Sequence, residues 1–381
     1  MNFELTSEQR QLQEAAHRLS LHRLMPMLAS HPKDLPLPKA AMLEIFQVLA
    51  EFGLTGARVP EELGGSGLKM LEYGLAFEQL PPVVALALIA HDGTTSRLCV
   101  SGAHKDFPHL ITDLLEGKKI ACTASTEPTT GSDPRSIKLR VRLSVDAQTA
   151  YLSGTKQWIT NGTIADIAFV TGKLEGNGEL QRYIVERADS PFHASEIPCV
   201  GLQQGHLSEL TFDQVPVPRS NAIGSENSTM KTLTQAWLVN RPLFGLLGLK
   251  AAERARDIAL QHVKDRVQFG STLASKQLIQ EAIVDMDASI QSARLLCYSA
   301  LDAADRGVAT QTLSAMAKRQ GVATAEQAAS IAMRLCGAMG LATETGLDQL
   351  ARDIKMFTIP DGTYEILTLI AGREITGQSA L

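Results

Sequence analysis

LRVRLSV, residues 139–145, alternates Leu and Val strictly with Arg and Ser. This two-residue rhythm is typical of a β-strand with one buried face. Runs of similar character, separated by Gly, Asn, Asp and Pro, occupy residues 121–125, 151–158, 167–171, 183–186 and 210–217. The sequence therefore predicts a small antiparallel β domain at residues 119–231.

Both flanks of this domain repeat their apolar residues at helical spacing. Before it, Thr6 and Gln9 form a capping-box pattern, a glycine-rich loop spans 60–67, and Pro81-Pro82 opens an apolar helix. After it, helical patterns rich in Ala, Leu, Glu and Arg cover 236–263, 276–306 and 310–335. We expect an α+β fold, mainly α, with an N-terminal helical domain at 1–118 and a C-terminal helical bundle at 232–381.

The charge and the apolar stretches of the sequence argue against a nucleic acid or a membrane as partner. The 381 residues carry a formal net charge of -5, and no dense Lys/Arg cluster is interleaved with aromatics, so no nucleic acid partner is expected. The N-terminus lacks a signal-peptide pattern. The longest apolar stretch, 83–90, is less than half of the roughly 20 residues that a spanning helix needs. We expect part of a buried helix, no membrane partner and a cytoplasmic location.

Sequence motifs exclude several chemistries. The five cysteines have no CxxC pair and no neighbouring histidines at metal-ligand spacing, so they are expected to be buried thiols and no metal site is predicted. GxGxxG in a βαβ unit, GxxxxGK[ST], HExxH and GxSxG are all absent. From these patterns alone, the chain is an α+β globular protein with a glycine-rich loop.

Six segments resemble motifs of the acyl-CoA dehydrogenase family, in the family's order. Two of them resemble its paired flavin-contact segments: TASTEPTTGSD (123–133) and KQWITNG (156–162). The others are PEELGG (60–65), RVQFG (266–270), CGAMG (336–340), and RD followed by PDGT (352–363). The resemblance covers nearly the whole chain. It implies a helical domain, a β domain and a four-helix bundle, with FAD as cofactor and a homotetramer or dimer as the assembly.

In that family the paired β segments border the flavin ring. The resemblance implies that Ser125 and Thr126 hydrogen-bond the pyrimidine edge, that Trp158 packs on the ring, and that Thr160 bonds near N5. Fixed donors at these positions stabilise the charge that the ring gains with a hydride. Ser132, which by itself would be a turn serine, matches a position at the pantetheine or thioester end of the substrate.

The C-terminal motifs match residues that hold the adenine half of FAD across a subunit interface. The resemblance assigns this role to Arg266, Gln268, Phe269 and Gln277. An arginine fork suits a pyrophosphate because it binds two oxygens.

Gly337 and Gly340 would let backbone amides approach the pyrophosphate closely. Ala338 replaces the family's second glycine, and Arg334 stands where the family usually has glutamine. Arg334 either strengthens phosphate binding or covers the end of the bundle.

The family's reaction needs a carboxylate that removes the proton α to a thioester while a hydride leaves the β carbon. The family uses the glutamate of YEGT, and the matching residue here is Asp361, one methylene shorter. The resemblance implies that Asp361 is the base and that its N–H and a ribityl hydroxyl hold the thioester carbonyl. It also implies that Gly362 and Arg241 contact the substrate and that Thr363 contacts FAD.

Alternatives to this base assignment stay open. Some family members place the base just before the bundle's first arginine, but here that residue is Asn240, whose amide is no base at neutral pH. Glu365, one helical turn after Asp361, is a fallback base. Asp361 could also serve only to cap a helix that begins at Gly362.

The predicted function is FAD-dependent oxidation of an acyl-CoA, or another acyl thioester, to the α,β-enoyl thioester. An electron-transfer flavoprotein or a similar acceptor would take the electrons. An aspartate base also resembles nitroalkane oxidase, which defines a second enzyme hypothesis. Further alternatives are an enoyl thioester reductase, a carrier-protein-linked desaturase, and a non-catalytic flavin-binding homologue. The fold alone does not separate them.

Overall fold

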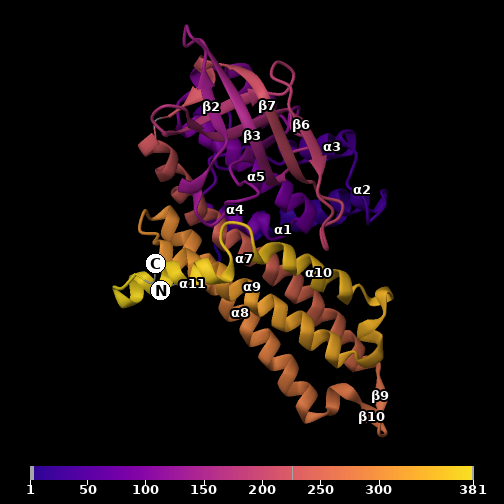
Figure 1. The fold of residues 1–381 in the computed structure, drawn as a ribbon. Helices are drawn as coiled ribbons and strands as arrows, with labels where there is room; N and C mark the ends of the chain where they lie inside the picture. Colours follow the sequence, from indigo (N-terminus) through magenta and orange to yellow (C-terminus); the bar gives the residue numbers. More distant parts are fainter. Residues whose placement is uncertain (1–3, 225, 380–381) are drawn as a thin grey trace.

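The computed structural model of the protein describes residues 4–224 and 226–379, without the side chains of 226–230 and 232. Helices come first in the chain, a β-sheet follows, and a bundle of long helices completes it (Figure 1). This order confirms the predicted fold class.

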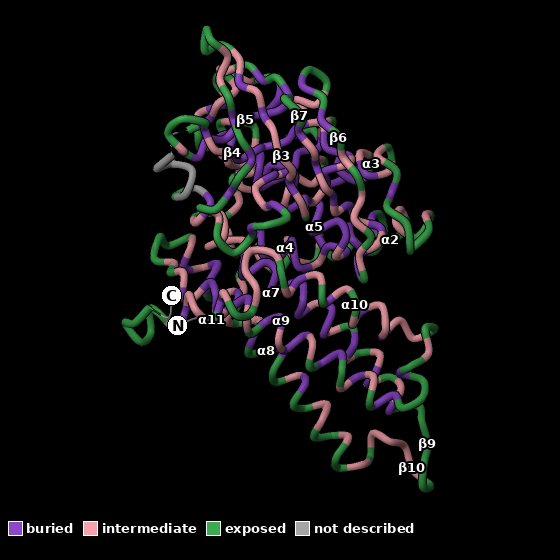
Figure 2. Tube along the Cα trace, in the orientation of Figure 1, coloured by how far each residue is buried: buried purple, intermediate pink, exposed green. Residues whose placement is uncertain are grey.

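The N-terminal helices enclose one helix that is buried on nearly every side. Thr6 and Gln9 form the predicted capping box at the first helix, with Thr6 Oγ1 accepting from the Gln9 N–H at 3.2 Å. The central helix, α5, begins at Pro82 as predicted and is buried along most of its length (Figure 2). The helices of this part are α1 (Ser7–Leu19), which continues as a π turn (Ser20–Leu24), α2 (Met25–Ala29), α3 (Lys39–Glu51), α4 (Met70–Phe77), α5 (Pro82–Val100) and α6 (Pro108–Leu115).

Helix α5 is the one described helix that is long and apolar enough to cross a membrane by composition. Because 78% of its most apolar window is buried inside the protein, its hydropathy is that of a core helix.

The described residues of the middle region form a sheet of eight strands, ordered β6-β7-β3-β2-β4-β5-β8 with β1 beside β4. Most neighbours are antiparallel, as predicted, but β1 and β2 each pair with β4 in parallel, so the predicted antiparallel domain contains two parallel pairs. Side-chain alternation reports burial and carries no information on strand direction. The strands are β1 (Ala121–Ala124), β2 (Arg140–Leu143), β3 (Thr149–Thr160), β4 (Ile167–Leu174), β5 (Leu180–Glu186), β6 (His193–Glu196), β7 (Leu207–Pro218) and β8 (Ala222–Ile223).

The strand predicted at 139–145 is shorter than its alternation suggests. It ends at Leu143 because Asp146 Oδ1 accepts hydrogen bonds from Ser144 Oγ at 2.5 Å and from the Gln148 N–H at 3.1 Å. An aspartate that bonds its neighbours in this way folds the chain into a turn. Val145 therefore lies fully exposed in a turn.

The C-terminal helices form an elongated bundle that projects away from the sheet (Figure 1). Glycines bring its two central helices together, since a Cβ on Gly321 of α9 would lie 2.7 Å from Gly245 Cα of α7. The elements are α7 (Glu226–Asp265), a hairpin of β9 (Val267–Gln268) and β10 (Ser271–Thr272), α8 (Gln277–Asp305), α9 (Gln311–Leu335), a 3₁₀ turn (Gly337–Leu341), α10 (Leu347–Thr358) and α11 (Tyr364–Thr376).

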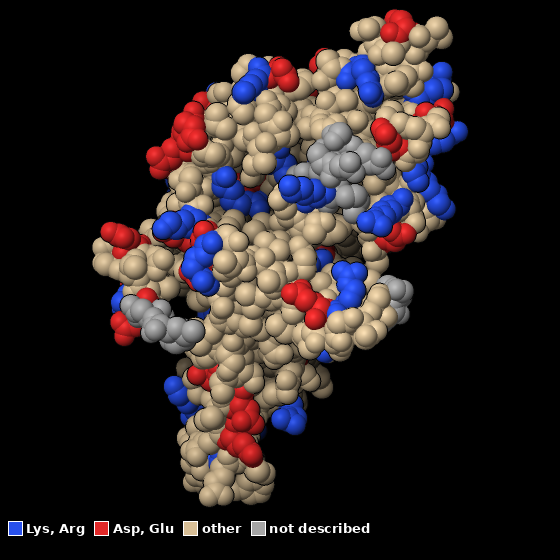
Figure 3. All heavy atoms as spheres, turned by 90° about the vertical axis from the view of Figure 1, so that its left-hand side faces the viewer, with Lys and Arg blue, Asp and Glu red and all other residues tan. Residues whose placement is uncertain are grey.

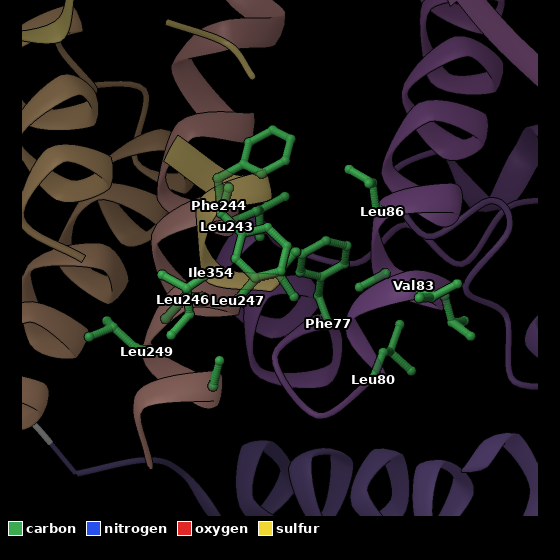
Figure 4. Close-up of a cluster of buried hydrophobic side chains, with 14 of the residues drawn as sticks. Phe77, Leu80, Val83, Leu86, Leu243, Phe244, Leu246, Leu247, Leu249 and Ile354 are labelled. Atoms are coloured by element: carbon green, nitrogen blue, oxygen red, sulfur yellow. The ribbon is translucent and has the colours of Figure 1, made fainter. Parts of the chain in front are cut away.

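A shared apolar core joins the first helices to the bundle. Figure 4 shows Phe77, Leu80, Val83 and Leu86 from the α4–α5 region facing side chains of α7 and Ile354 of α10. Because α5 also packs against β1, it lies between sheet and bundle. Residues at the C-terminal half of α5 can therefore contact both.

Candidate active site

The two predicted flavin-contact segments lie side by side. The Gln157 N–H donates to Thr126 O at 2.9 Å, and Lys156 Nζ donates to Ser125 O at 2.8 Å. Lys156 also forms a buried ion pair with Glu127 at 2.9 Å. These contacts explain why two segments separated by residues 134–155 form one surface.

Trp158 stands out on this surface because its indole is exposed. The β3–β7 register shifts between Lys156 and Ile159, and Trp158 adopts a left-handed φ of 62° in this bulge. Its side chain is 52% exposed, although large aromatic residues usually bury most of their area. Thr160 follows in the strand, half-buried opposite Leu207. An exposed ring beside half-buried Ser125 and Thr126 fits a planar aromatic cofactor.

Lys156 and Glu127 join the two segments by a buried ion pair, and sequence reasoning did not predict this pair. Glu127 also accepts the N–H groups of Lys138 at 2.7 Å and Leu139 at 2.8 Å. Burial lowers the pKa of Lys156 to about 8, against the attraction of Glu127. The two-residue alternation of β3 places Lys156 on the buried face of the strand. A lysine on a buried face was the signal that could have identified the pair.

Ser132 lies exposed in the turn that follows this surface. Asp133 organises the turn, because its carboxylate accepts the Arg135 N–H at 3.1 Å and the Ser136 hydroxyl. The Ser132 side chain is thus left at the surface.

Asp361 lies in the short loop between α10 and α11, with a left-handed φ of 54°. Aspartate tolerates this conformation better than most residues. Its Oδ2 is buried and has no hydrogen-bond partner among the described residues. A buried carboxylate oxygen without a donor is costly, so this arrangement is typical of a functional group.

Two buried cations hold the loop by its backbone. Arg241 Nε donates to Asp361 O at 2.9 Å. Lys318, on α9, donates to Gly362 O at 2.7 Å, to Pro360 O and, more weakly, to Thr358 O at 3.4 Å. Burial lowers the pKa of Lys318 to about 7, while Asp361 raises it and Arg241 lowers it.

A proline interrupts the hydrogen bonds of α7 directly after Arg241. Pro242 has no N–H, so the carbonyl of Leu238 loses its helical partner, and Ser314 Oγ donates to that carbonyl instead at 2.7 Å. Arg241 is 3% exposed, and its Nη1 donates to Gln311 Oε1 at 2.7 Å. Arg241, which was predicted to contact the substrate, thus contacts the Asp361 loop directly.

The alternative that Asp361 caps the following helix is wrong. Thr363 is the N-cap of α11, and its Oγ1 accepts the Ile366 N–H. Glu365 lies exposed in the first turn of α11, and hydrogen bonds from its own N–H and from Thr363 lower its pKa. Exposure and a lowered pKa make Glu365 a weak candidate base.

Further charged residues surround Asp361, and sequence reasoning missed them. Arg58 donates to Asp92 Oδ2 through Nε at 2.5 Å and to Asn240 Oδ1 through Nη1 at 3.1 Å. Burial acts to lower the pKa of both Arg58 and Arg97, while the charges of Asp92 and Asp361 act to raise it. The net effect raises the pKa of Arg58 and lowers that of Arg97 to about 9. An aspartate and an arginine in α5, after its apolar first half, were the available signal.

The residues predicted to hold the adenine half of FAD lie apart from Asp361. Arg266, Gln268 and Phe269 form the exposed hairpin at the far end of the bundle, where Phe269 is 94% exposed (Figure 2). Also exposed are Gln277, at the start of α8, and Arg334 and Gly337, at the end of α9. Gly340 is buried, because a Cβ there would lie 2.1 Å from Met333 O.

The described residues contain no group of His, Cys, Asp and Glu that could hold a metal ion. Four cysteines are buried as predicted, but Cys199 is half-buried. Cys199 lies in the loop between β6 and β7, a position that the spacing of the cysteines does not indicate.

The sequence matches the N-terminal, middle and C-terminal domains of acyl-CoA dehydrogenases at residues 6–103, 122–215 and 229–376. Benzylmalonyl-CoA dehydrogenase of Aromatoleum aromaticum is 30% identical over 99% of this chain and 100% of its own. The chain belongs to the acyl-CoA dehydrogenase family. Acryloyl-CoA reductase (NADH) of Anaerotignum propionicum is 29% identical over 98% of this chain and 96% of its own. The butyryl-CoA dehydrogenase structure from Megasphaera elsdenii superposes with a TM-score of 0.91, at 28% identity over 99% of this chain and all of that one.

Members of the acyl-CoA dehydrogenase family are FAD-binding oxidoreductases that act on CH–CH bonds, so this chain is an enzyme of that type. Its residues fit the cofactor. Trp158 offers an exposed ring, and Gly337, with φ of 57° and nothing within 4 Å of a Cβ, leaves its backbone open to a phosphate. The hydride-accepting chemistry is supplied by FAD when it is bound.

Proposed function

We propose that this acyl-CoA dehydrogenase family member oxidises an acyl-CoA thioester to the α,β-enoyl thioester, with Asp361 removing the α proton. The observation that carries the proposal is the Asp361 carboxylate, whose Oδ2 is buried without a donor while its backbone is clamped. A carboxylate oxygen that is not already hydrogen-bonded is free to approach the α proton of a substrate.

Arg241 and Lys318 supply the rigidity that this role needs. An aspartate is one methylene shorter than the family's glutamate, so small errors in loop position affect its reach strongly. Three loop carbonyls are bound by Lys318 and a fourth by Arg241. We infer that this clamp compensates for the shorter side chain by fixing the loop, with the Asp361 N–H and Gly362 next to the thioester carbonyl.

The flavin surface is the second part of the proposal. Ser125, Thr126, Trp158 and Thr160 would hold the flavin ring, Ser132 would contact the pantetheine or thioester, and Thr363 would lie against FAD. The hairpin residues Arg266, Gln268 and Phe269 lie at the opposite end of the bundle from Asp361 (Figure 1). With Gln277, Arg334, Gly337 and Gly340, they would therefore bind the adenine half of an FAD held mainly by another subunit.

A homo-oligomer follows from this proposal. Several large apolar side chains of the bundle are exposed in the single chain, and a subunit interface would bury them. They include Phe269, Leu278, Val284, Leu341 and Ile375. We further propose the domain boundaries 1–118, 119–231 and 232–381, a cytoplasmic location and electron transfer to a flavoprotein acceptor.

The test is anaerobic titration of the flavin-loaded protein with acyl-CoA thioesters and, separately, with a nitroalkane. Flavin that bleaches with a thioester supports the dehydrogenase. Bleaching only with the nitroalkane would replace it by an oxidase. Oxidation of NADH coupled to an enoyl thioester would reverse the proposed direction.

Asp361→Asn tests the base directly. The variant is expected to bind flavin like the parent but to lose flavin reduction by about 10³-fold or more, because only proton abstraction is removed. Glu365→Gln is the matched control, with the same chemical change one turn away, and should reduce flavin at the parental rate. If Asp361→Asn reduces flavin at the parental rate and Glu365→Gln does not, Glu365 is the base instead.

A further inference from the structure

Two guanidinium groups converge beside Gly93, in the middle of α5. A Cβ on Gly93 would lie 3.0 Å from Arg58 Nη2 and 4.0 Å from Arg97 Nη2. The two nitrogens therefore border the same small volume. A side chain at position 93 would crowd Arg58 Nη2, so Gly93 allows both guanidinium groups to lie against the backbone of α5.

Both arginines have buried donors left over. The Arg58 side chain is 9% exposed, and its Nη2 has no hydrogen-bond partner among the described residues. Arg97 Nε is buried and likewise lacks an acceptor there, although Arg97 Nη2 donates to the Thr123 hydroxyl. Buried donors without acceptors are rare in folded proteins and indicate a missing partner.

Arg97 lacks an ion-pair partner among the described residues. Asp92 pairs with Arg58 at 2.5 Å, and the charge of Asp361 acts on both arginines through space, but no described acidic residue forms an ion pair with Arg97. Arg182 stacks on the same Phe169 ring as Arg97, at 5.2 and 5.9 Å from the centroid. Burial, then the charges of Arg182 and Arg58, lower the pKa of Arg97 to about 9. Burying cations near one another is unfavourable unless an anion joins them.

This cluster adjoins the proposed base. Arg58 Nη1 contacts Asn240 at 3.1 Å, and the next residue, Arg241, holds the Asp361 carbonyl. Arg97 further borders a cavity of about 200 Å³ that Phe169, Arg182 and Ile223 also line. On the face in Figure 3, Lys and Arg side chains gather across the middle of the molecule, some of them in a recess.

We propose that the acyl group of the substrate carries a carboxylate at its far end, and that Arg58 and Arg97 bind this carboxylate beside Gly93. The proposal rests on the proposed function, because it places the thioester end of the same molecule at Asp361. A guanidinium fork matches the two oxygens of a carboxylate, whereas an unsubstituted alkyl tail offers no acceptor to either arginine.

The proposal is tested by pairing substrates of equal carbon number. Succinyl-, glutaryl- and adipyl-CoA are compared with butyryl-, pentanoyl- and hexanoyl-CoA, and kcat/KM is measured for flavin reduction. At one length, the carboxylated thioester is expected to be preferred by about 100-fold, the size expected for one or two hydrogen bonds to a charged group. Equal or better use of every uncharged partner would overturn the proposal.

Three variants separate recognition from folding. Arg97→Gln and Arg58→Gln remove one donor group each, and Gly93→Ala pushes Arg58 Nη2 out of its position while keeping both charges. Each is expected to lower the preference ratio by about ten- to 100-fold. Arg140→Gln, an exposed arginine of β2, is the control for net charge and should leave the ratio unchanged. An equal loss for charged and uncharged thioesters in all three site variants would mean a structural role and would overturn the assignment.

A binding measurement distinguishes failure of the carboxylate site from failure of the proposed function. Asp361→Asn is titrated with the same thioester pairs, and the shift of the visible flavin spectrum reports the dissociation constant without turnover. Tighter binding of the carboxylated member supports the site, and equal binding contradicts it. If neither set of thioesters binds to the variant or bleaches the parent, the proposed function fails and the carboxylate assignment fails with it.

Discussion

Replacing Lys318 by methionine is expected to slow flavin reduction while leaving flavin affinity unchanged. Lys318 is completely buried, and its three acceptors all belong to the loop from Thr358 to Gly362. Methionine has a similar length and no donor. The loop would keep its packing but lose the hydrogen bonds that fix Asp361.

The magnitude follows from the contacts. Two of the three hydrogen bonds are short, and a hydrogen bond to a charged group contributes about 1.5–3 kcal/mol. Part of this is offset, because the variant no longer buries a charge whose pKa is already lowered to about 7. We therefore expect the unfolding free energy to fall by about 2–4 kcal/mol. A displacement of the carboxylate by about 1 Å is expected to slow flavin reduction by about 100-fold.

The assay is stopped-flow flavin reduction under anaerobic conditions, with urea unfolding and flavin titration in parallel. Arg294→Met is the matched control, since Arg294 of α8 is a half-buried cation that pairs with Glu78 at 2.7 Å and makes no contact with the Asp361 loop among the described ion pairs. It should lose similar stability, about 3–5 kcal/mol, without slowing reduction. If Lys318→Met reduces flavin at the parental rate, or if Arg294→Met slows it equally, the loop clamp has no specific role.

Two further predictions concern stability. His91 accepts the Ala121 N–H on Nδ1 and contacts Leu114 O through Nε2, and burial lowers its pKa to about 4, so its stabilisation is present above pH 6.5 and lost as pH falls toward 4. Urea unfolding should show a loss of roughly 3 kcal/mol between these pH values that is absent in His91→Gln, and an identical pH dependence would contradict the neutral histidine. Gly340→Ala should destabilise the protein by about 3 kcal/mol or more, because its Cβ would meet Met333 O at 2.1 Å. Gly337→Ala, with open space around its Cβ, should cost only about 1–2 kcal/mol for its left-handed φ, and urea midpoints that rank the two variants in the opposite order would refute this.

Sequence reasoning identified the site where residues lie in contiguous motifs. Ser125, Thr126 and Trp158 occur in two short segments, and Asp361, Gly362 and Thr363 are consecutive. It missed Lys318, Arg58 and Arg97, which come from three separate elements and meet only in the folded chain. The charged residues within the buried α5 were a signal of a polar site, but the sequence offered no reason to group Arg97 with Arg58 and Lys318.

The sequence by itself determined the order of helices, sheet and bundle, because hydrophobic periodicity and capping residues act over short stretches. It also indicated the family through motifs in their proper order. It did not determine the direction of the strands, which depends on their pairing in the sheet. It also did not determine where β2 ends or which residue caps α11, which depend on the hydrogen bonds that individual side chains form. Only the tertiary structure decided which cations surround Asp361. Burial brings charges from distant segments together, and their electrostatic coupling depends on distance in space rather than on separation along the chain.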